Sequence, residues 1–189
     1  GIALKPLLTE LAGIDRFTGA AETQLSFLGV GQSVDQIMRS LSGEGRFAIG
    51  RGSIEGIDLD DLLGSFDVQG GTTVFDSARA SFTLSKGVAP NSDLEMLLPN
   101  FEARGAGRID LGQQQIDYTF TPKALRVNGA RGLAVPVRIV GPWSDPSIRP
   151  DLEAAIDLNF REERKQAEER VKRQVEEKLA EELGVVREE

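Results

Sequence analysis

The sequence contains no cysteine and no histidine, and these two absences exclude most of the familiar catalytic chemistry. Without them the chain has no thiolate nucleophile, no Ser-His-Asp triad and no imidazole base, and it has few ways to hold zinc or another transition metal. We therefore expect a protein that is not an enzyme, with no catalytic residue, no metal site and no cofactor.

Positive charge and long apolar runs are also scarce. The 189 residues include 22 Lys and Arg against 30 Asp and Glu, which gives a net charge of −8. Because a nucleic-acid-binding surface needs an excess of positive charge, we expect no nucleic-acid partner. No apolar run approaches the roughly 20 residues that a membrane-spanning helix needs.

What the sequence has in abundance is the period-two alternation of apolar and polar residues that is typical of half-buried strands. It runs through residues 73–84, 101–111, 116–121 and 135–139, and residues 19–30 and 45–57 also read as extended segments. Several strands that agree predict an antiparallel sheet with one dry and one wet face. The residues expected on the dry face are Val74, Ala78, Ala80, Phe82, Leu84, Phe101, Ala103, Ile109, Leu111, Ile116, Tyr118, Phe120, Val135, Val137 and Ile139.

Two short helices are predicted to cover part of this dry face. Residues 33–42 begin with a capping box at Ser33 and Gln36, and residues 58–66 begin with Asp58 as N-cap. Two helices of about 15 Å each cannot shield five or more strands spaced about 4.8 Å apart. We therefore expect a curved antiparallel sheet of the open groove type, whose remaining apolar area meets the C-terminal helix, a second copy, a neighbouring domain or lipid.

The small residues Ala78, Ala80 and Ala103, together with Gly105 and Gly107, allow two interpretations. They leave room for a chain to approach the sheet closely, or they permit the sheet to curve. Asp110 and Asp117 flank one predicted turn, and a carboxylate-only hydrolase is the enzymatic alternative. Both carboxylates alternate with apolar neighbours, which places them on the wet face without a cleft.

The C-terminal part of the chain changes character at a proline-rich segment. Residues 145–150 contain two prolines and are predicted to form a corner rather than a strand or helix. A helix is expected from Asp151 to about Leu183, with a break near Asn159. It carries a thin apolar stripe at Ala167, Val171, Val175, Leu179 and Leu183. We predict a β-rich domain at 1–150 and a charged amphipathic helix at 151–189, which packs on the body, docks a partner, forms a coiled coil or is mobile.

Three segments together resemble the C-terminal region of the AsmA family, and the resemblance runs from about Pro6 to Leu152. Each segment is a weak signal by itself, whereas their order and spacing are fairly specific. The segments are Gly52–Leu63, Ala103–Leu111 followed by Ile116–Tyr118, and Pro136–Pro146 followed by Arg149–Asp151.

This resemblance implies a single inner-membrane helix upstream of the sequence and a long periplasmic body of curved β-sheet. Such a body presents a hydrophobic groove to phospholipids moving toward the outer membrane. We therefore expect a periplasmic segment, tethered to the inner membrane, that binds phospholipid acyl chains and serves outer-membrane biogenesis. The alternative is an assembly module of the bacterial envelope that carries no lipid and binds partner proteins through its C-terminal helix.

Overall fold

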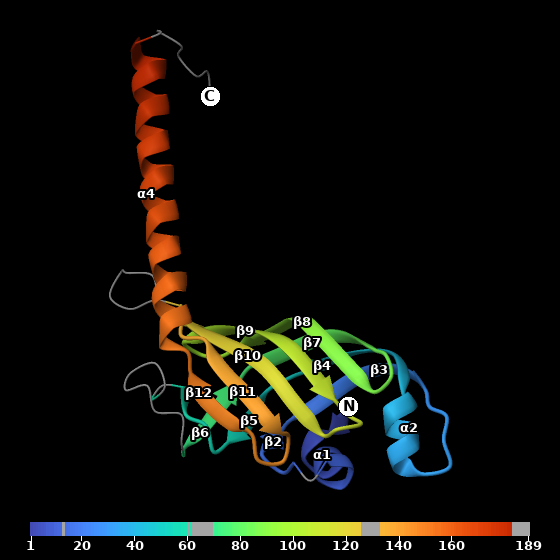
Figure 1. Cartoon of the computed structure of the whole chain (residues 1–189). Helices are drawn as coiled ribbons and strands as arrows, with labels where there is room; N and C mark the ends of the chain where they lie inside the picture. The colour runs from blue at the N-terminus through green and yellow to red at the C-terminus, as the bar shows by residue number, and fades with distance from the viewer. Residues whose placement is uncertain (13, 60, 62–69, 126–132, 183–189) are drawn as a thin grey trace. The chain divides into compact units, whose positions relative to one another are not determined.

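A curved antiparallel sheet of nine strands dominates the first of the two units into which the chain divides, Gly1–Leu152 and Glu153–Glu189 (Figure 1). The structure is a computed structural model that describes residues 1–12, 14–59, 61, 70–125 and 133–182. The strand order is β1-β3-β4-β7-β8-β9-β10-β11-β12, and every neighbouring pair is antiparallel. The predicted fold class, a curved open antiparallel sheet followed by a long C-terminal helix, is confirmed.

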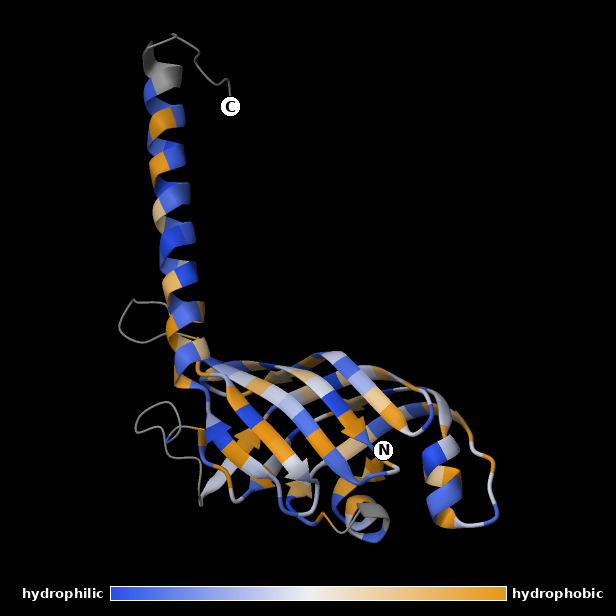
Figure 2. Ribbon diagram, viewed as in Figure 1, coloured by the Kyte–Doolittle hydropathy of each residue, from blue (hydrophilic) through white to orange (hydrophobic). Residues whose placement is uncertain are grey.

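The strands of the large sheet follow the chain closely, because each strand pairs with the next strand of that sheet along the sequence. Figure 2 shows hydrophobic and hydrophilic residues alternating along them, as expected for strands with one buried face. Their bounds are β1 (Ile2–Ala3), β3 (Ala20–Leu28), β4 (Ser42–Ile49), β7 (Ser77–Leu84), β8 (Val88–Leu97), β9 (Phe101–Asp110), β10 (Gln115–Ala124), β11 (Val137–Pro142) and β12 (Ser147–Pro150).

A second, three-stranded sheet packs against one end of the inner face of the large sheet. It consists of β2 (Phe17–Thr18), β5 (Gly52–Glu55) and β6 (Thr72–Phe75), in the order β2-β5-β6. Its buried side chains Ile54 and Phe75 belong to the same apolar cluster as Met96, Phe101 and Val137 of the large sheet. This cluster is the core of the first unit, and it occupies one end of the inner face.

Two predicted continuous strands are each divided between the two sheets. The segment predicted at 45–57 forms β4 and β5, and the segment predicted at 73–84 forms β6 and β7. The chain changes sheet near Gly50 and again at Asp76, whose N–H donates to the Leu97 carbonyl (2.8 Å). Alternation alone does not reveal a change of sheet, because both halves remain extended.

The helix predicted at 33–42 is present as α2 (Val34–Ser40), but it does not cover the sheet. Its cap forms as predicted: Ser33 Oγ accepts from the Gln36 N–H (3.2 Å), and Gln36 Oε1 accepts from the Gln32 N–H (2.8 Å). None of its residues is buried, and Val34 is 73% exposed. The helix lies in the connection between β3 and β4 at one end of the sheet (Figure 1), which explains why its apolar residues remain in solvent.

The second predicted covering helix, at 58–66, falls largely outside the described residues. Asp58 Oδ1 accepts a hydrogen bond from the Asp61 N–H (3.1 Å), which is the contact expected of an N-cap. The sequence reading missed a further helix, α1 (Leu4–Ala12). Its Pro6 lies in the first turn, where a helix tolerates the missing N–H.

The prediction of a corner at 145–150 is wrong in part, because Ser147–Pro150 form the edge strand β12. Its register with β11 pairs Ile139 with Ile148 and Val137 with Pro150. Proline lacks a ladder donor, but at the end of an edge strand no second neighbour requires one. Only the residues just before β12 form the turn, where the Asp145 N–H donates to the Pro142 carbonyl (3.0 Å).

The second unit consists of most of α4 (Leu152–Glu182), a helix of 31 residues. The break predicted near Asn159 is absent, because the helix continues from Leu152 to Glu182. The side-chain amide of Asn159 donates to the Ala155 carbonyl one turn earlier (2.6 Å). The residues predicted at its end, from Leu183 onward, lie outside the described part. Among the described residues, no helix has the length and apolarity to span a membrane.

Candidate functional site

The inner face of the large sheet lines an apolar cavity of about 460 Å³. The cavity continues from the core cluster toward the end of the sheet that the small sheet leaves uncovered, and we call it the inner groove. Among the described residues that form its wall, no side chain is charged, and Asn91 and Tyr118 are the polar ones. The lining residues are Phe17, Phe27, Phe47, Ile49, Ile54, Ile57, Leu59, Phe75, Ala78, Ala80, Phe82, Leu84, Ala89, Asn91, Leu94, Met96, Ile109, Leu111, Ile116, Tyr118, Phe120, Val137, Ile139 and Ile148.

Strand register explains why one wall is so uniformly apolar. Residues directly opposite each other in an antiparallel pair point to the same side of the sheet. Ile116 therefore shares a side with Ile109, and Ile109 with Ala89, which continues one row across three strands. A second row joins Ile139, Tyr118, Gly107 and Asn91 in the same manner.

Aromatic rings in the groove lie over glycines. A Cβ on Gly45 would come within 2.6 Å of the Phe82 ring, and a Cβ on Gly105 would come within 2.6 Å of both Leu94 and Tyr118. Phe82 also stacks on Phe27, with ring centroids 6.1 Å apart. The space above Gly105 is thus filled by the protein itself, so this glycine serves internal packing rather than the approach of a bound chain.

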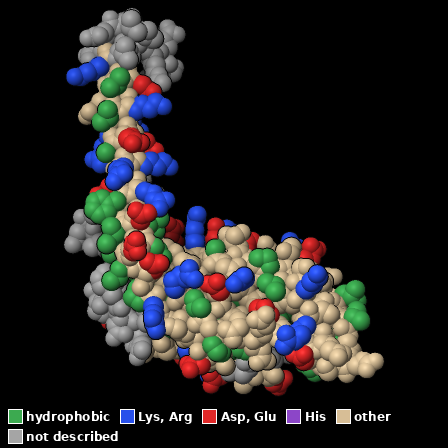
Figure 3. Space-filling view, viewed as in Figure 1, with side chains coloured by type: hydrophobic (Ala, Val, Ile, Leu, Met, Phe, Trp, Pro, Cys, Tyr) green, Lys and Arg blue, Asp and Glu red, His purple; other side chains and the backbone are tan. Residues whose placement is uncertain are grey.

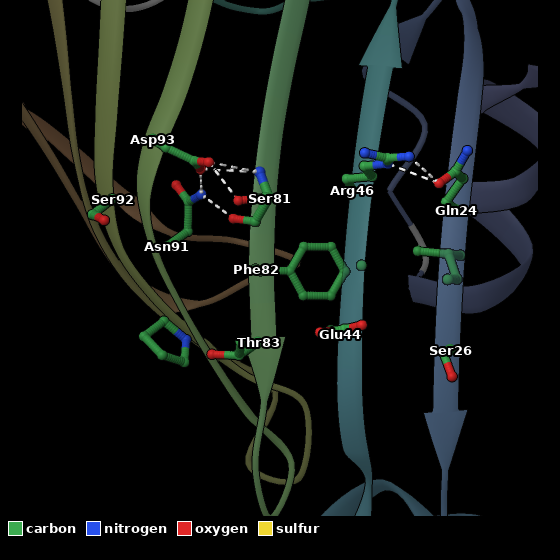
Figure 4. Close-up of a pocket in the computed structure, with 13 residues that line it drawn as sticks. Gln24, Ser26, Glu44, Arg46, Ser81, Phe82, Thr83, Asn91, Ser92 and Asp93 are labelled. Atoms are coloured by element: carbon green, nitrogen blue, oxygen red, sulfur yellow. Dashed lines mark hydrogen bonds between the residues drawn. The ribbon is translucent and has the colours of Figure 1, made fainter.

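The polar residues of the groove belong to a network that crosses from β8 to β7. The Tyr118 hydroxyl donates to Asn91 Oδ1, and the Asn91 amide donates to the Ser81 carbonyl (2.7 Å) and to Asp93 Oδ1 (2.6 Å). Asp93 in turn accepts from the Ser81 N–H (3.0 Å) and from the Ser81 hydroxyl. Figure 4 shows Asn91, Asp93 and Ser81 meeting in this way between the two strands.

This network replaces a missing part of the sheet ladder. β7 and β8 are paired from Ser77 to Arg79, and β8 has a register shift between Asn91 and Leu94. Beyond Arg79, side chains of β8 bind both the N–H and the carbonyl of Ser81. Pro90 lies in the same stretch, where its lack of an N–H breaks no bond to β7. We call this part of the β7–β8 junction the seam.

The seam and its surroundings shift two pKa values. Burial raises the pKa of Tyr118 to about 12, and the negative charge of Asp93 adds to the rise. The Ser81 hydroxyl, followed by the Ser81 N–H, holds the pKa of Asp93 below its ordinary value. Tyr118 is therefore neutral and Asp93 ionised at neutral pH, so that the groove wall itself carries no charge.

The outer face of the sheet is polar and carries ion pairs between neighbouring strands. Asp117 lies between Arg108 (3.7 Å) and Arg138 (2.8 Å), and Arg79 pairs with Glu95. In Figure 3, Lys, Arg, Asp and Glu side chains are scattered over this face. The second carboxylate singled out in the sequence, Asp110, accepts from the Gln113 N–H (2.8 Å) in the hairpin turn. Within the described part of the chain, no three acidic side chains come together as metal ligands would.

A second hollow, of about 830 Å³, lies along β3, β4, β7 and β8 (Figure 4). Its lining includes Glu44, Arg46 and Asp93, and Arg46 donates to Gln24 Oε1 across its floor (2.8 Å). These side chains alternate with groove residues along the strands and so belong to the outer face. Its charged lining makes it a poor site for hydrocarbon despite its larger volume.

Most of the predicted dry-face residues line the inner groove. The structure brings together Ala78, Ala80, Phe82, Leu84, Ile109, Leu111, Ile116, Tyr118, Phe120, Val137 and Ile139. Phe101 and Ala103 are buried in the core cluster at the covered end, and Val135 is completely buried outside the groove.

Val74 is the one predicted residue whose placement is wrong. It is 41% exposed, whereas its neighbours Thr73 and Phe75 are buried. β6 pairs with β5 in the small sheet, and the bend at Asp76 resets which residues point inward before β7 begins. Phe75, an apolar residue at a position where the alternation of 73–84 would place a polar one, is therefore a groove residue.

Several groove residues escaped the sequence analysis because they lie on strands with a disturbed pattern. Ala89, Leu94 and Met96 come from β8, where the register shift and Pro90 interrupt the alternation. Phe17 and Ile54 come from the small sheet, whose strands are too short to show a period. Phe27 and Phe47 stood in segments that were predicted as extended, and their aromatic character was the available signal.

A model of the AsmA family matches residues 1–94. The chain belongs to the AsmA family. The matched span includes the first of the three resembling segments and ends within β8, so the later two segments lie outside it. No curated protein and no solved structure gave a significant match. That this AsmA chain corresponds to the C-terminal region of the family remains a prediction.

Proposed function

We propose that this AsmA-family chain is a non-enzymatic lipid-handling segment of the bacterial envelope whose inner groove holds phospholipid acyl chains. The observation that carries the proposal is the wall of the groove, in which the lining residues that the structure describes include no charged side chain. Membership of the AsmA family agrees with a role in envelope lipid transport. On this proposal the segment resides in the periplasm, tethered to the inner membrane in the full-length protein.

Burial of apolar area supplies the driving force. Each buried CH₂ contributes about 0.8 kcal/mol, so an acyl chain in the groove replaces water contacts that are costly for both surfaces. Phe82, Ile109, Leu111 and Ile116 are only partly buried at the end that the small sheet leaves uncovered, and a hydrocarbon chain would complete their packing. Charged headgroups have no counterpart in the wall and stay in water.

Charge placed in the groove tests the proposal. We expect Phe82→Asp and Ile109→Asp to abolish retention of phospholipid, because a carboxylate in an apolar wall cannot be desolvated beside a hydrocarbon chain. Ala106→Asp is the matched control: it introduces the same group on the exposed outer face of the strand that carries Ile109. Native mass spectrometry after gentle extraction measures the lipid that co-purifies, and circular dichroism checks the fold.

The competing function is an assembly module of the envelope that carries no lipid cargo. The apolar residues that α4 leaves in solvent favour it, because such a stripe is typical of a helix that docks on a partner. Lipid-free wild-type protein that is fully folded would support this alternative. Phospholipid masses that disappear in the two groove variants and persist in Ala106→Asp would exclude it as the sole function.

A further inference from the structure

The exposed face of α4 carries an apolar stripe with a regular spacing. Ile156, Phe160, Val171 and Val175 are 60%, 56%, 59% and 50% exposed. Together with Arg164 and Ala167 they follow one another at intervals of four, four, three, four and four residues. This spacing is close to the 11-residue repeat that keeps one stripe on one side of an α-helix with a right-handed supercoil. Figure 3 shows hydrophobic side chains following one another along the helix among charged ones.

The order of these intervals reads the same in both directions, so the stripe matches itself when a second helix runs the opposite way. Ile156 then meets Val175, Phe160 meets Val171, and Arg164 meets Ala167. In each pair the two residue numbers add to 331. The four large apolar residues of the stripe therefore pair with one another, and the long Arg164 lies over the small Ala167.

The charges beside the stripe match in the same antiparallel register. On one flank, Asp157 faces Lys172 of the second helix and Arg161 faces Glu168, pairs whose numbers add to 329. On the other flank, Glu163 faces Arg170, with a sum of 333. In an antiparallel helix pair, contacts on one flank join residues whose numbers add to two less than the sum for the stripe, and contacts on the other flank join residues whose numbers add to two more. Each of these ion pairs occurs twice because the dimer is symmetric.

A parallel pair in register lacks this match. It places Arg164 against its own copy at the interface between the helices, and it brings Glu163 of one helix beside Glu168 of the other. Both contacts join like charges, which are destabilising at this range. Two unfavourable contacts exist in the antiparallel pair: Glu153 faces Glu176 at the outer ends, and Arg164 lies beside Lys165 near the centre, where the residue numbers also add to 329.

From this match we propose that α4 is a homodimerisation helix that pairs antiparallel with α4 of a second copy, centred between Lys165 and Gln166. The inference is independent of the proposed lipid function, because it rests on α4 alone. It gives the charged helix a partner of defined chemistry, a second copy of itself. The two-fold axis passes through the midpoint of the stripe and produces a closed dimer rather than a filament.

Disulfide trapping tests the arrangement in the full chain, which has no cysteine of its own. An equimolar mixture of Ile156→Cys and Val175→Cys chains should form a covalent dimer on mild oxidation. Each variant by itself should not, because two copies of residue 156 stand about 28 Å apart along an antiparallel pair. Glu169→Cys, on the opposite side of the helix, is the matched control and should give no covalent dimer.

Charge reversal tests the register in solution. Arg161→Glu and Glu168→Arg should each weaken the dimer about ten-fold in sedimentation equilibrium, because each creates two like-charged contacts, and the double variant should restore it. Glu176→Lys should tighten the dimer by converting the repulsive contact with Glu153 into an attractive one. Circular dichroism establishes that every variant keeps its helix.

Three results would overturn the proposal. Wild-type chain that sediments as a monomer at all accessible concentrations excludes the dimer. Covalent self-dimers of Ile156→Cys establish a parallel pair instead. Charge reversals that leave association unchanged show that another surface joins the copies. Lipid retention in these same variants reports on the groove separately, so failure of one proposal is distinguishable from failure of the other.

Discussion

Tyr118 is the residue at which the apolar groove touches the polar network of the seam. Its ring fills the space above Gly105, and its hydroxyl donates to Asn91. It is the only tyrosine of the chain, so its ionisation can be followed without interference from another tyrosine. The same side chain therefore packs the groove, anchors the network and reports on both.

The raised pKa of Tyr118 predicts a loss of stability at high pH. A phenol with a pKa of about 12 in the folded state and about 10.0 in the unfolded state holds its proton more tightly when folded. Its contribution is complete below about pH 10 and is lost as the pH rises toward 12. Urea unfolding across this range should show the loss in wild-type protein, and tyrosinate absorbance should locate the titration.

Tyr118→Phe is the control for this pH dependence. It should remove the part of the alkaline loss that belongs to the phenol. At neutral pH it should cost about 1 to 2 kcal/mol, because Asn91 Oδ1 loses its donor. An alkaline profile identical in the two proteins would show that Tyr118 titrates in the folded state as it does in solvent.

Gly105 tests whether the groove wall is packed to its limit. Gly105→Val should destabilise the fold by about 1 to 3 kcal/mol, because the Cβ of the new side chain would lie only 2.6 Å from atoms of Tyr118 and Leu94. Ala106→Val, one residue along β9 and on the exposed outer face, should be neutral or slightly stabilising. Equal effects of the two substitutions in thermal unfolding would contradict the packing described here.

Among the elements, the β7–β8 seam has side-chain bonds in place of part of its ladder. Asp93→Ala removes the acceptor of the Ser81 N–H, and we expect amide exchange at Ser81 to become about ten-fold faster. Ser92→Ala, which alters an exposed neighbour, is the control. Hydrogen exchange measured by NMR resolves the individual amides.

Acid should open the same seam without mutation. The pKa of Asp93 is lowered in the folded state, so its stabilising effect is present above the unfolded-state pKa and is lost as the pH falls through the folded one. The protection factor of the Ser81 amide, which is its intrinsic exchange rate divided by the observed rate, should therefore fall in acid in wild-type protein. In Asp93→Ala it should be low at all pH values. A seam that is insensitive to acid would show that Asp93 does not hold it.

The elements also show what a single sequence reveals and what it hides. Regular alternation in β7, β9 and β10 was sufficient to predict which residues face the groove, because each of these strands stays in one sheet. Val74 was misplaced because the chain passes from one sheet to the other at Asp76. Odd-numbered residues point inward before this bend, and even-numbered residues point inward after it. β8 was missed because Pro90 and a register shift interrupt its pattern, and these irregularities form the seam. The small sheet is defined by contacts far apart in sequence, which no local pattern contains.

At the scale of the whole molecule, the two units present two surfaces of different chemistry. The first unit has a groove lined by aliphatic and aromatic side chains, whereas α4 has a narrow stripe flanked by matched charges. Hydrocarbon fits a wall without charge, and a charged helix recognises another helix through its flanks. A protein with both surfaces can bind lipid and assemble independently, provided that neither surface depends on the other.

That independence is testable through the thermal stability of the full chain. A ligand that binds only the folded state stabilises it by about 2.7 kcal/mol at one hundred times its dissociation constant. We therefore expect a short-chain phosphatidylcholine, added below its micelle concentration, to raise the melting temperature of wild-type protein and of Ala106→Asp. Phe82→Asp should show no such rise, because its groove no longer accepts hydrocarbon. Val171→Asp, which places a carboxylate in the α4 stripe, should abolish the dimer and still show the full rise. If Val171→Asp instead loses the response to lipid, the groove is complete only in the assembled state, and the two surfaces form one site.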